Sequence, residues 1–291
     1  MSDSTRPKIT VPSLRARKGA GPPIIALTAY DHPTASALDE AGVDVLLVGD
    51  SLGMVVLGYD TTLPVTMDEM VHHTAAVARA RSAALVVADM PFLSYHASLQ
   101  DAISNAGRFV QEGGAEAVKI EGGRRRAGIV SAIVGADIPV MGHIGLTPQA
   151  VHAMGGFRVQ GKSQEAVQAL LDDVRALEDA GAFSVVLEGI PAEAARLITR
   201  ATALPTIGIG AGPDCDGQIL VVHDLLGWTP GAPPKFVRRY ADLRSLTIEA
   251  VRAFAADVAA RRFPSPSECY AASVKLVDPE AERRGQSPEG T

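Results

Sequence analysis

Four acidic residues stand where four short apolar stretches of this sequence end. The stretches are rich in Val, Ile and Ala, and the acids that close them are Asp50, Asp89, Glu121 and Glu188. If the stretches are parallel strands, their carboxyl ends meet at one edge and the four carboxylates converge there. Carboxylates gathered in water-poor surroundings must be protonated or must hold a cation. The pattern therefore predicts an acidic, cation-binding site.

The type of ligand indicates which cation this site would hold. Oxygen donors without a His-Cys cluster favour a hard divalent ion such as Mg²⁺ over zinc. We expect Asp50, Asp89 and Glu121 to be the metal ligands. Each of them alone is equally compatible with a helix N-cap that follows a strand. Three such acids on adjacent strands favour the metal site over three separate caps.

Other polar residues at the same strand ends fit this chemistry. Lys119 lies two residues before Glu121, so both side chains point to one face of a strand. The lysine could hold a substrate carboxylate, or it could form a structural ion pair with Glu121. Glu188 is the carboxylate that the metal does not need, and it could act as general base. His143 ends another stretch and could contact substrate, although a lone histidine is more often a structural hydrogen-bonding group.

Eight apolar stretches of this kind alternate with Ala-rich segments of helical period. Such alternation indicates βαβ units, because parallel strands need a crossover long enough for a helix. Eight units predict an α/β fold of the closed (β/α)8 TIM-barrel type, whereas loss of the weak eighth strand would leave an open doubly wound sheet. The predicted strands are residues 24–28, 45–49, 85–89, 117–121, 139–143, 184–188, 205–209 and 219–225.

The composition along the chain predicts one barrel domain with two flanking segments. The 291 residues suit a single barrel, which commonly takes about 250. Residues 1–22 form an N-terminal lead-in that ends in prolines, and residues 23–265 form the catalytic barrel. Residues 266–291 are rich in Pro, Ser, Glu and Arg, so we expect a mobile C-terminal extension.

Charge and cysteine content limit the partners and the compartment. The formal net charge of −6 gives no reason to expect nucleic acid as a partner. The short basic run Arg124-Arg125-Arg126 predicts a solvated loop or helix start, with a local anion or subunit contact as the alternative. Cys215 and Cys269 cannot build a disulfide framework, which fits a reducing compartment. Without a signal peptide or an apolar run of membrane length, we expect a cytoplasmic protein with no membrane partner.

Distinctive motifs run through most of the chain. The longest is VGDSLGMVVLGYDTTLPVTMDEMVHHTAAV at residues 48–77, and VKIEGG, GHIGLTPQ and LEGIP stand at 118–123, 142–149 and 187–191. Over roughly residues 8 to 265, these motifs resemble the ketopantoate hydroxymethyltransferase family. The resemblance implies three metal ligands, four residues that contact a keto acid and one proton acceptor. The metal ligands would be Asp50, Asp89 and Glu121. The residues that contact the keto acid would be Asp50, Ser51, Asp89 and Lys119, and the proton acceptor would be Glu188.

The resemblance also implies a reaction and an assembly. Members of the family transfer a hydroxymethyl group from 5,10-methylenetetrahydrofolate to 3-methyl-2-oxobutanoate, on the way to pantothenate and coenzyme A. They depend on Mg²⁺ and form ring-like homo-oligomers, often decamers. We therefore expect a keto acid and a folate as the small-molecule partners of this chain.

Two other functional hypotheses fit some of these features. A lyase of the phosphoenolpyruvate mutase and isocitrate lyase type also combines a barrel, Mg²⁺ and an enolate, but it would carry a reactive cysteine loop. Neither Cys215 nor Cys269 stands in such a loop. A barrel kept only as a structural or regulatory subunit would lose its strand-end acids, and here all of them are present.

Overall fold

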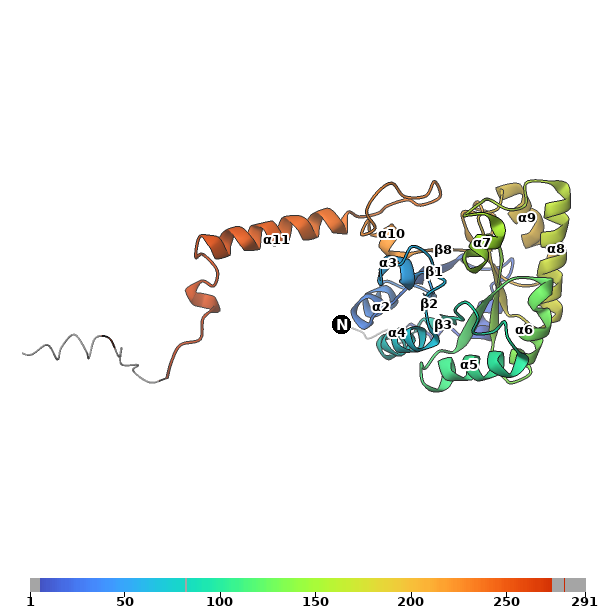
Figure 1. The fold of residues 1–291 in the computed structure, drawn as a ribbon, viewed down its shortest axis with the longest axis horizontal. Helices are drawn as coiled ribbons and strands as arrows, with labels where there is room; N and C mark the ends of the chain where they lie inside the picture. Colours follow the sequence, from blue (N-terminus) through green and yellow to red (C-terminus); the bar gives the residue numbers. More distant parts are fainter. Residues whose placement is uncertain (1–5, 82, 274–279, 281–291) are drawn as a thin grey trace, which may run out of the picture. The chain divides into compact units, whose positions relative to one another are not determined.

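Eight parallel strands in the described part of the chain form a closed barrel (Figure 1). The computed structural model describes residues 6–81, 83–273 and 280. Strand β8 pairs with β1, which excludes the open sheet and confirms the predicted (β/α)8 barrel. The strands are β1 (Ile24–Thr28), β2 (Val45–Val48), β3 (Leu85–Asp89), β4 (Ala117–Glu121), β5 (Val140–Gly145), β6 (Ser184–Glu188), β7 (Thr206–Ile209) and β8 (Gly217–Leu220).

The predicted eighth strand, residues 219–225, is divided in the structure between a strand and a helix. Only its first residues belong to β8, and helix α10 (Val222–Leu225) takes up the rest. The amide of Val222 donates to the hydroxyl oxygen of Thr28 over 2.9 Å, so it is withdrawn from strand pairing. The apolar run predicted as strand 219–225 is therefore a short strand followed by a short helix.

Helices cover the outside of the barrel, and polar caps set where several of them begin. Thr66 and Glu69 form a reciprocal capping box at the start of α4, and Ser163 caps α8. Helix α8 buries Leu170 and Val174, two of its regularly spaced apolar residues. The helices around the barrel include α2 (His32–Glu40), α3 (Leu52–Val55), α4 (Met67–Ala80), α5 (Leu99–Gln111), α6 (Ala127–Val134), α7 (Val151–Met154), α8 (Gln164–Asp179) and α9 (Ala192–Ala201), with the 3-10 turns η1 (Arg124–Arg126) and η2 (Pro148–Ala150).

Alternating strand residues divide the apolar core into two layers. Leu46 and Val48 of β2 pack outward with residues of the surrounding helices. Val45 and Leu47 of the same strand pack inside the barrel with the matching residues of other strands. Leu14 of the lead-in is fully buried in this inner layer, so the lead-in contributes to the barrel interior.

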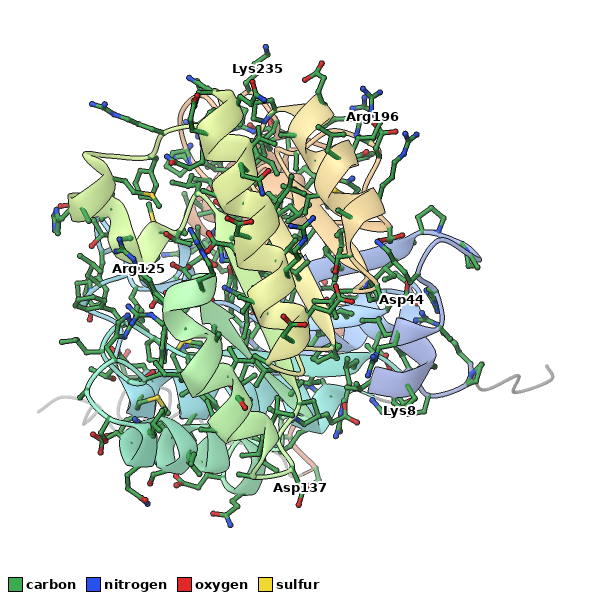
Figure 2. The ribbon with its side chains drawn as sticks, turned by 90° about the vertical axis from the view of Figure 1, so that its right-hand side faces the viewer. Lys8, Asp44, Arg125, Asp137, Arg196 and Lys235 are labelled. Atoms are coloured by element: carbon green, nitrogen blue, oxygen red, sulfur yellow. The ribbon has the colours of Figure 1, made fainter. Side chains whose placement is uncertain are left out.

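The lead-in includes a short helix, α1 (Val11–Arg15), held by charged contacts. Arg6 and Arg17 both bind the carboxylate of buried Asp44, which directly precedes β2. In Figure 2, Asp44 and Arg125 lie on opposite sides of the barrel. The lead-in therefore closes the amino end of the barrel and leaves the carboxyl end, where the strand-end acids lie, open for a site.

Contacts group the chain into two compact units, Met1–Asp242 and Leu243–Thr291. The second unit contains helix α11 (Leu243–Ala259) and the turn η3 (Pro266–Glu268). Most of the C-terminal extension predicted at 266–291 lies outside the described residues. Within the described chain, no helix combines the length and the apolar character needed to cross a bilayer.

Candidate active site

Three acids and a lysine form one buried cluster at the carboxyl ends of β2, β3 and β4. Asp50, Asp89, Lys119 and Glu121 are each no more than 5% exposed. The register pairs Asp89 with Lys119, and the lysine Nζ lies 2.8 Å from Asp89 Oδ1 and 3.9 Å from Glu121 Oε1. The amide of Asp50 donates to Asp89 Oδ2 over 3.3 Å. The parallel strands thus bring together the polar residues that end them.

His143 of β5 connects this cluster to Glu188 of β6. Its Nδ1 lies 3.2 Å from Lys119 Nζ and 3.5 Å from Glu121 Oε1. Its Nε2 lies 3.2 Å from Glu188 Oε2. The Glu188 side chain is 18% exposed, whereas that of His143 is 3% exposed. Glu188 is therefore the member of this chain of contacts that a substrate could reach most easily.

Burial and mutual repulsion shape the ionisation of the cluster. Burial raises the pKa of Asp50 well above its ordinary value, and the carboxylates of Asp89 and Glu121 raise it further. Burial also raises the pKa of Asp89, against the opposing charge of Lys119. For Glu121, burial is outweighed by His143 and Lys119, which hold its pKa below the ordinary value. The carboxyl of Asp50 is thus the one whose ionisation a bound cation would favour most.

The same neighbours change the pKa of the histidine. Burial and the charge of Lys119 act to lower the pKa of His143, but hydrogen bonding to Glu121 and Glu188 raises it to about 9. The ring lies between Glu121 and Glu188, so His143 can connect the two carboxylates. These contacts support a role for His143 in positioning Glu188, beyond the purely structural role that the sequence left open.

The three predicted metal ligands lie in one cluster, but they already have partners within the protein. Among the described residues, no three Asp, Glu, His or Cys side chains surround a point that a metal ion could occupy. Glu121 is engaged by Lys119, His143 and the Gln149 amide, which donates to its Oε2 over 3.0 Å. Asp89 is likewise engaged by Lys119, and Asp50 by Gln149. Mg²⁺ is commonly held by one or two carboxylates together with water and substrate oxygens. The three predicted ligands lie in one cluster without being arranged as a preformed triad.

A glutamine that the sequence analysis did not select organises the cluster. Gln149 Nε2 donates to Asp50 Oδ2 and to the carbonyl oxygen of Met90, both over 2.9 Å. Its Oε1 accepts the hydroxyl hydrogen of buried Tyr95 over 2.7 Å. Gln149 stands in η2 rather than at a strand end, and it is uncharged, so a search for charged strand ends missed it. Its only signal was the GHIGLTPQ motif, whose last residue it is.

Ser51, predicted to contact the keto acid, lies at the edge of the cluster. It immediately precedes α3, and its hydroxyl oxygen is 2.8 Å from the hydroxyl oxygen of Tyr30. Tyr30 is buried, so this contact fixes the serine hydroxyl next to Asp50. Ser51 is only partly buried and could turn its hydroxyl towards a ligand.

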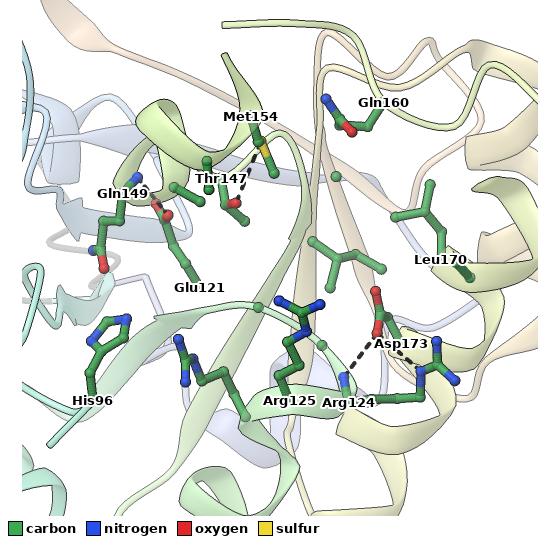
Figure 3. Close-up of a pocket in the computed structure, with 18 of the residues that line it drawn as sticks. His96, Glu121, Arg124, Arg125, Thr147, Gln149, Met154, Gln160, Leu170 and Asp173 are labelled. Carbon is green, nitrogen blue, oxygen red and sulfur yellow. Dashed lines mark hydrogen bonds and ion pairs between the residues drawn. The ribbon is translucent and has the colours of Figure 1, made fainter. Parts of the chain in front are cut away.

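A cavity of about 1050 Å³ leads outward from the cluster (Figure 3). Glu121 and Gln149 line its inner part, and the loop after β3, η1, α7 and the first turns of α8 form its walls. The buried cluster therefore stands next to a space large enough for an organic ligand.

The fold and the cluster define an enzyme of the α/β-barrel class, with its site at the carboxyl ends of the strands. Comparison with known proteins identifies the family. The model of the ketopantoate hydroxymethyltransferase family matches residues 8–266, so the chain belongs to this family of transferases.

Relatives with high identity carry the name of the same enzyme. The 3-methyl-2-oxobutanoate hydroxymethyltransferase of Carboxydothermus hydrogenoformans is 56% identical over 271 residues, which cover 93% of this chain and 98% of the relative. The enzyme of the same name from Geobacter metallireducens is 57% identical over 263 residues, covering 90% and 98%. The predicted resemblance is therefore confirmed.

Solved structures of other enzymes share the fold. Phosphoenolpyruvate phosphomutase from Streptomyces platensis subsp. rosaceus matches with a TM-score of 0.58 at 16% identity, over 90% of this chain and 92% of that one. Phosphonopyruvate hydrolase in complex with oxalate and Mg²⁺ also matches with a TM-score of 0.58 at 16% identity, over 89% and 92%. At this identity the likeness shows the barrel fold alone. The lyase alternative therefore shares the architecture of this chain but not its family.

Proposed function

We propose that the chain transfers the one-carbon unit of 5,10-methylenetetrahydrofolate to 3-methyl-2-oxobutanoate and forms 2-dehydropantoate, a precursor of pantothenate and coenzyme A. The name shared by its relatives supports this reaction. The observation that carries the proposal is the series of contacts from Asp89 through Lys119 and His143 to Glu188. This series joins a buried charged cluster to a partly exposed carboxylate, as proton removal next to a bound keto acid requires.

The keto acid would lie at the mouth of the barrel beside the cluster. Asp50, Asp89 and Glu121 would hold Mg²⁺, which when bound draws electrons from the substrate carbonyl and makes the adjacent C–H more acidic. Lys119 balances the negative charge of the cluster and favours an anionic substrate. Ser51 and His143 would supply hydrogen bonds at its edge. Glu121 keeps Lys119 and His143 in place through its ion-pair contacts.

Glu188 would accept the C3 proton of the keto acid. Its carboxylate is oriented by His143 and is the most accessible acid of the series. As the proton passes to Glu188, the electrons of the C–H bond form the enolate, whose carbon makes the new bond to the one-carbon unit. The bonds from the one-carbon unit to the two folate nitrogens break, and water supplies the oxygen of the new hydroxymethyl group. The proton taken from C3 and one proton of that water complete tetrahydrofolate, which leaves. The enclosed position of the cluster limits the access of other water to the enolate.

Conversion of the keto acid tests this proposal directly. Purified protein, given Mg²⁺, 5,10-methylenetetrahydrofolate and 3-methyl-2-oxobutanoate, should form 2-dehydropantoate, detectable by mass spectrometry. EDTA should abolish turnover and excess Mg²⁺ should restore it. Full turnover by metal-free protein would remove Mg²⁺ from the proposal, and failure to form product under any of these conditions would refute it.

The predicted homo-oligomer, a decamer by resemblance, is also part of the proposal. Helix α11 carries exposed apolar side chains, with Val251, Phe254 and Val258 separated by three and four residues and each at least 47% exposed. An apolar stripe on a helix is typical of a surface that packs against another element. The stripe supports contacts between copies of the chain.

A further inference from the structure

The cavity beside the buried cluster is much larger than a small keto acid needs. Ligand pockets commonly have volumes of roughly 300–1,000 Å³, and this one reaches about 1050 Å³. It begins at Glu121 and extends along the loops after β4 and β5 to α8. A second substrate placed there would lie next to a keto acid bound at the cluster, as transfer of a carbon unit requires.

One wall of this cavity is aromatic. The rings of Tyr95 and His96 lie 4.1 Å apart at 33°, and Phe92 lies 5.5 Å from His96. On the α8 side the wall is small and apolar, with Ala166 and Ala169 among its residues. Such a slot accepts a flat ring system, because aromatic and aliphatic surfaces can pack on its two faces.

The His96 ring of this wall is neutral. Its Nδ1 is buried without a hydrogen-bond partner in the described structure. Burial and the charge of Arg126 lower the pKa of His96, so the ring is neutral at pH 7 and its Nδ1 could donate or accept, depending on the tautomer.

Three arginines stand at the outer part of the cavity, and they are not equivalent. Arg124 lies 3.6 Å from the carboxylates of both Asp172 and Asp173. No ion pair with a described residue engages Arg125 or Arg126. The Arg126 guanidinium lies over the Tyr95 ring at 5.9 Å, and Figure 3 shows the Arg125 side chain directed into the cavity. Two positive charges thus remain available to an anionic ligand beside the aromatic wall.

We infer that this cavity binds the folate substrate, with its fused ring against the partly exposed Phe92 and His96 rings and the carboxylates of its glutamate tail at Arg125 and Arg126. The inference rests on the proposed function, since it assigns the folate, the second substrate of that reaction, to this cavity. A folate combines a flat heterocycle with a dianionic tail, and the cavity combines an aromatic slot with two uncompensated guanidinium groups. The short basic run therefore has a role as an anion contact, the alternative that its sequence left open.

Binding of two unreactive ligands to Arg125→Ala tests the charge contact. Tetrahydrofolate carries the glutamate tail, and tetrahydropteroate has the same ring system without it. We expect the exposed Arg125→Ala variant to bind tetrahydrofolate about tenfold more weakly than wild type, by calorimetry, and to bind tetrahydropteroate equally well. Arg125→Lys should recover part of the loss. Arg196→Ala, which removes an exposed arginine of α9 far from Arg125 in Figure 2, is the matched control and should bind both ligands as wild type does.

A second variant tests the slot by its size. Ala169→Phe fills part of the cavity from α8, so it should weaken both ligands to a similar extent. If Arg125→Ala and Ala169→Phe bind tetrahydrofolate like wild type while the wild-type protein converts the keto acid, the inference is wrong and the proposed function stands. If wild-type protein neither binds tetrahydrofolate nor forms product, both fail.

Discussion

His143 and Gln149 show how single residues hold the site together. His143 contacts Lys119, Glu121 and Glu188, while Gln149 connects Asp50 to Tyr95. The strand-end acids were predictable because acids that end parallel strands converge in any such barrel. Gln149 was not, because an amide in a loop turn has no pattern of charge or period that marks it.

Replacement of Gln149 tests its role in positioning the metal site. Gln149→Leu replaces the amide by an apolar side chain of similar size, so Asp50 Oδ2 and the Tyr95 hydroxyl lose this hydrogen-bond partner. We expect the Mg²⁺ concentration for half-maximal turnover to rise about 10- to 100-fold, measured by titration of metal-free protein. Gln168→Leu, on the exposed face of α8 and outside the cavity lining, is the control for loss of an amide elsewhere. An unchanged Mg²⁺ requirement in Gln149→Leu would show that the contact to Asp50 does not position a metal ligand.

At the scale of elements, the barrel depends on how the lead-in is tied to the strands. Asp216, between β7 and β8, accepts from Lys18 Nζ over 2.9 Å, from the Gly19 amide over 3.0 Å and from the Thr206 amide over 2.8 Å. The sequence predicted the strands from their short apolar stretches, a pattern that is strong where both faces are buried, and the helices only as the segments between them. It gave no sign of these long-range charged contacts, because they pair residues nearly two hundred positions apart.

The ionisation of Asp216 gives a pH-dependent test of this tie. Burial opposes its ionisation, but the Thr206 amide and Lys18 hold the pKa of Asp216 below its ordinary value. A lowered pKa contributes stability above the unfolded value of about 4 and loses it as pH falls through the folded pKa. Asp216→Asn should therefore lower the melting temperature at pH 7 by about 5 °C, and its difference from wild type should shrink towards pH 3.

Thermal unfolding followed by circular dichroism at several pH values provides the measurement. Exposed Asp214, two residues away, is the matched control, and Asp214→Asn should change little at any pH. A pH-independent difference between Asp216→Asn and wild type would show that the charge of Asp216 does not contribute to stability.

At the scale of the whole molecule, the two compact units have different surfaces. The barrel unit buries its charged site and its apolar layers, whereas α11 in the second unit exposes an apolar stripe. A helical pattern in residues 243–259 is visible in the sequence, but exposure of its apolar face depends on tertiary contacts that local pattern does not report.

Disruption of the stripe tests the proposed assembly. Phe254→Glu places a charge in the middle of the exposed apolar residues of α11, so we expect the oligomer to dissociate at least in part, measured by light scattering after size exclusion. Arg252→Ala, on another face of the same helix, should keep the wild-type mass. A Phe254→Glu variant with an unchanged oligomeric mass would exclude the stripe as an assembly surface.

The central claim is that Glu188 removes the C3 proton of a keto acid held by the buried cluster. Proton NMR can follow exchange of that hydrogen of 3-methyl-2-oxobutanoate with deuterium in D₂O, with Mg²⁺ and without folate. We expect wild-type protein to catalyse this exchange and Glu188→Gln, which keeps the size of the side chain, to slow it by about a hundredfold or more. Equal exchange rates in Glu188→Gln and wild type, or no exchange by wild type, would contradict the account.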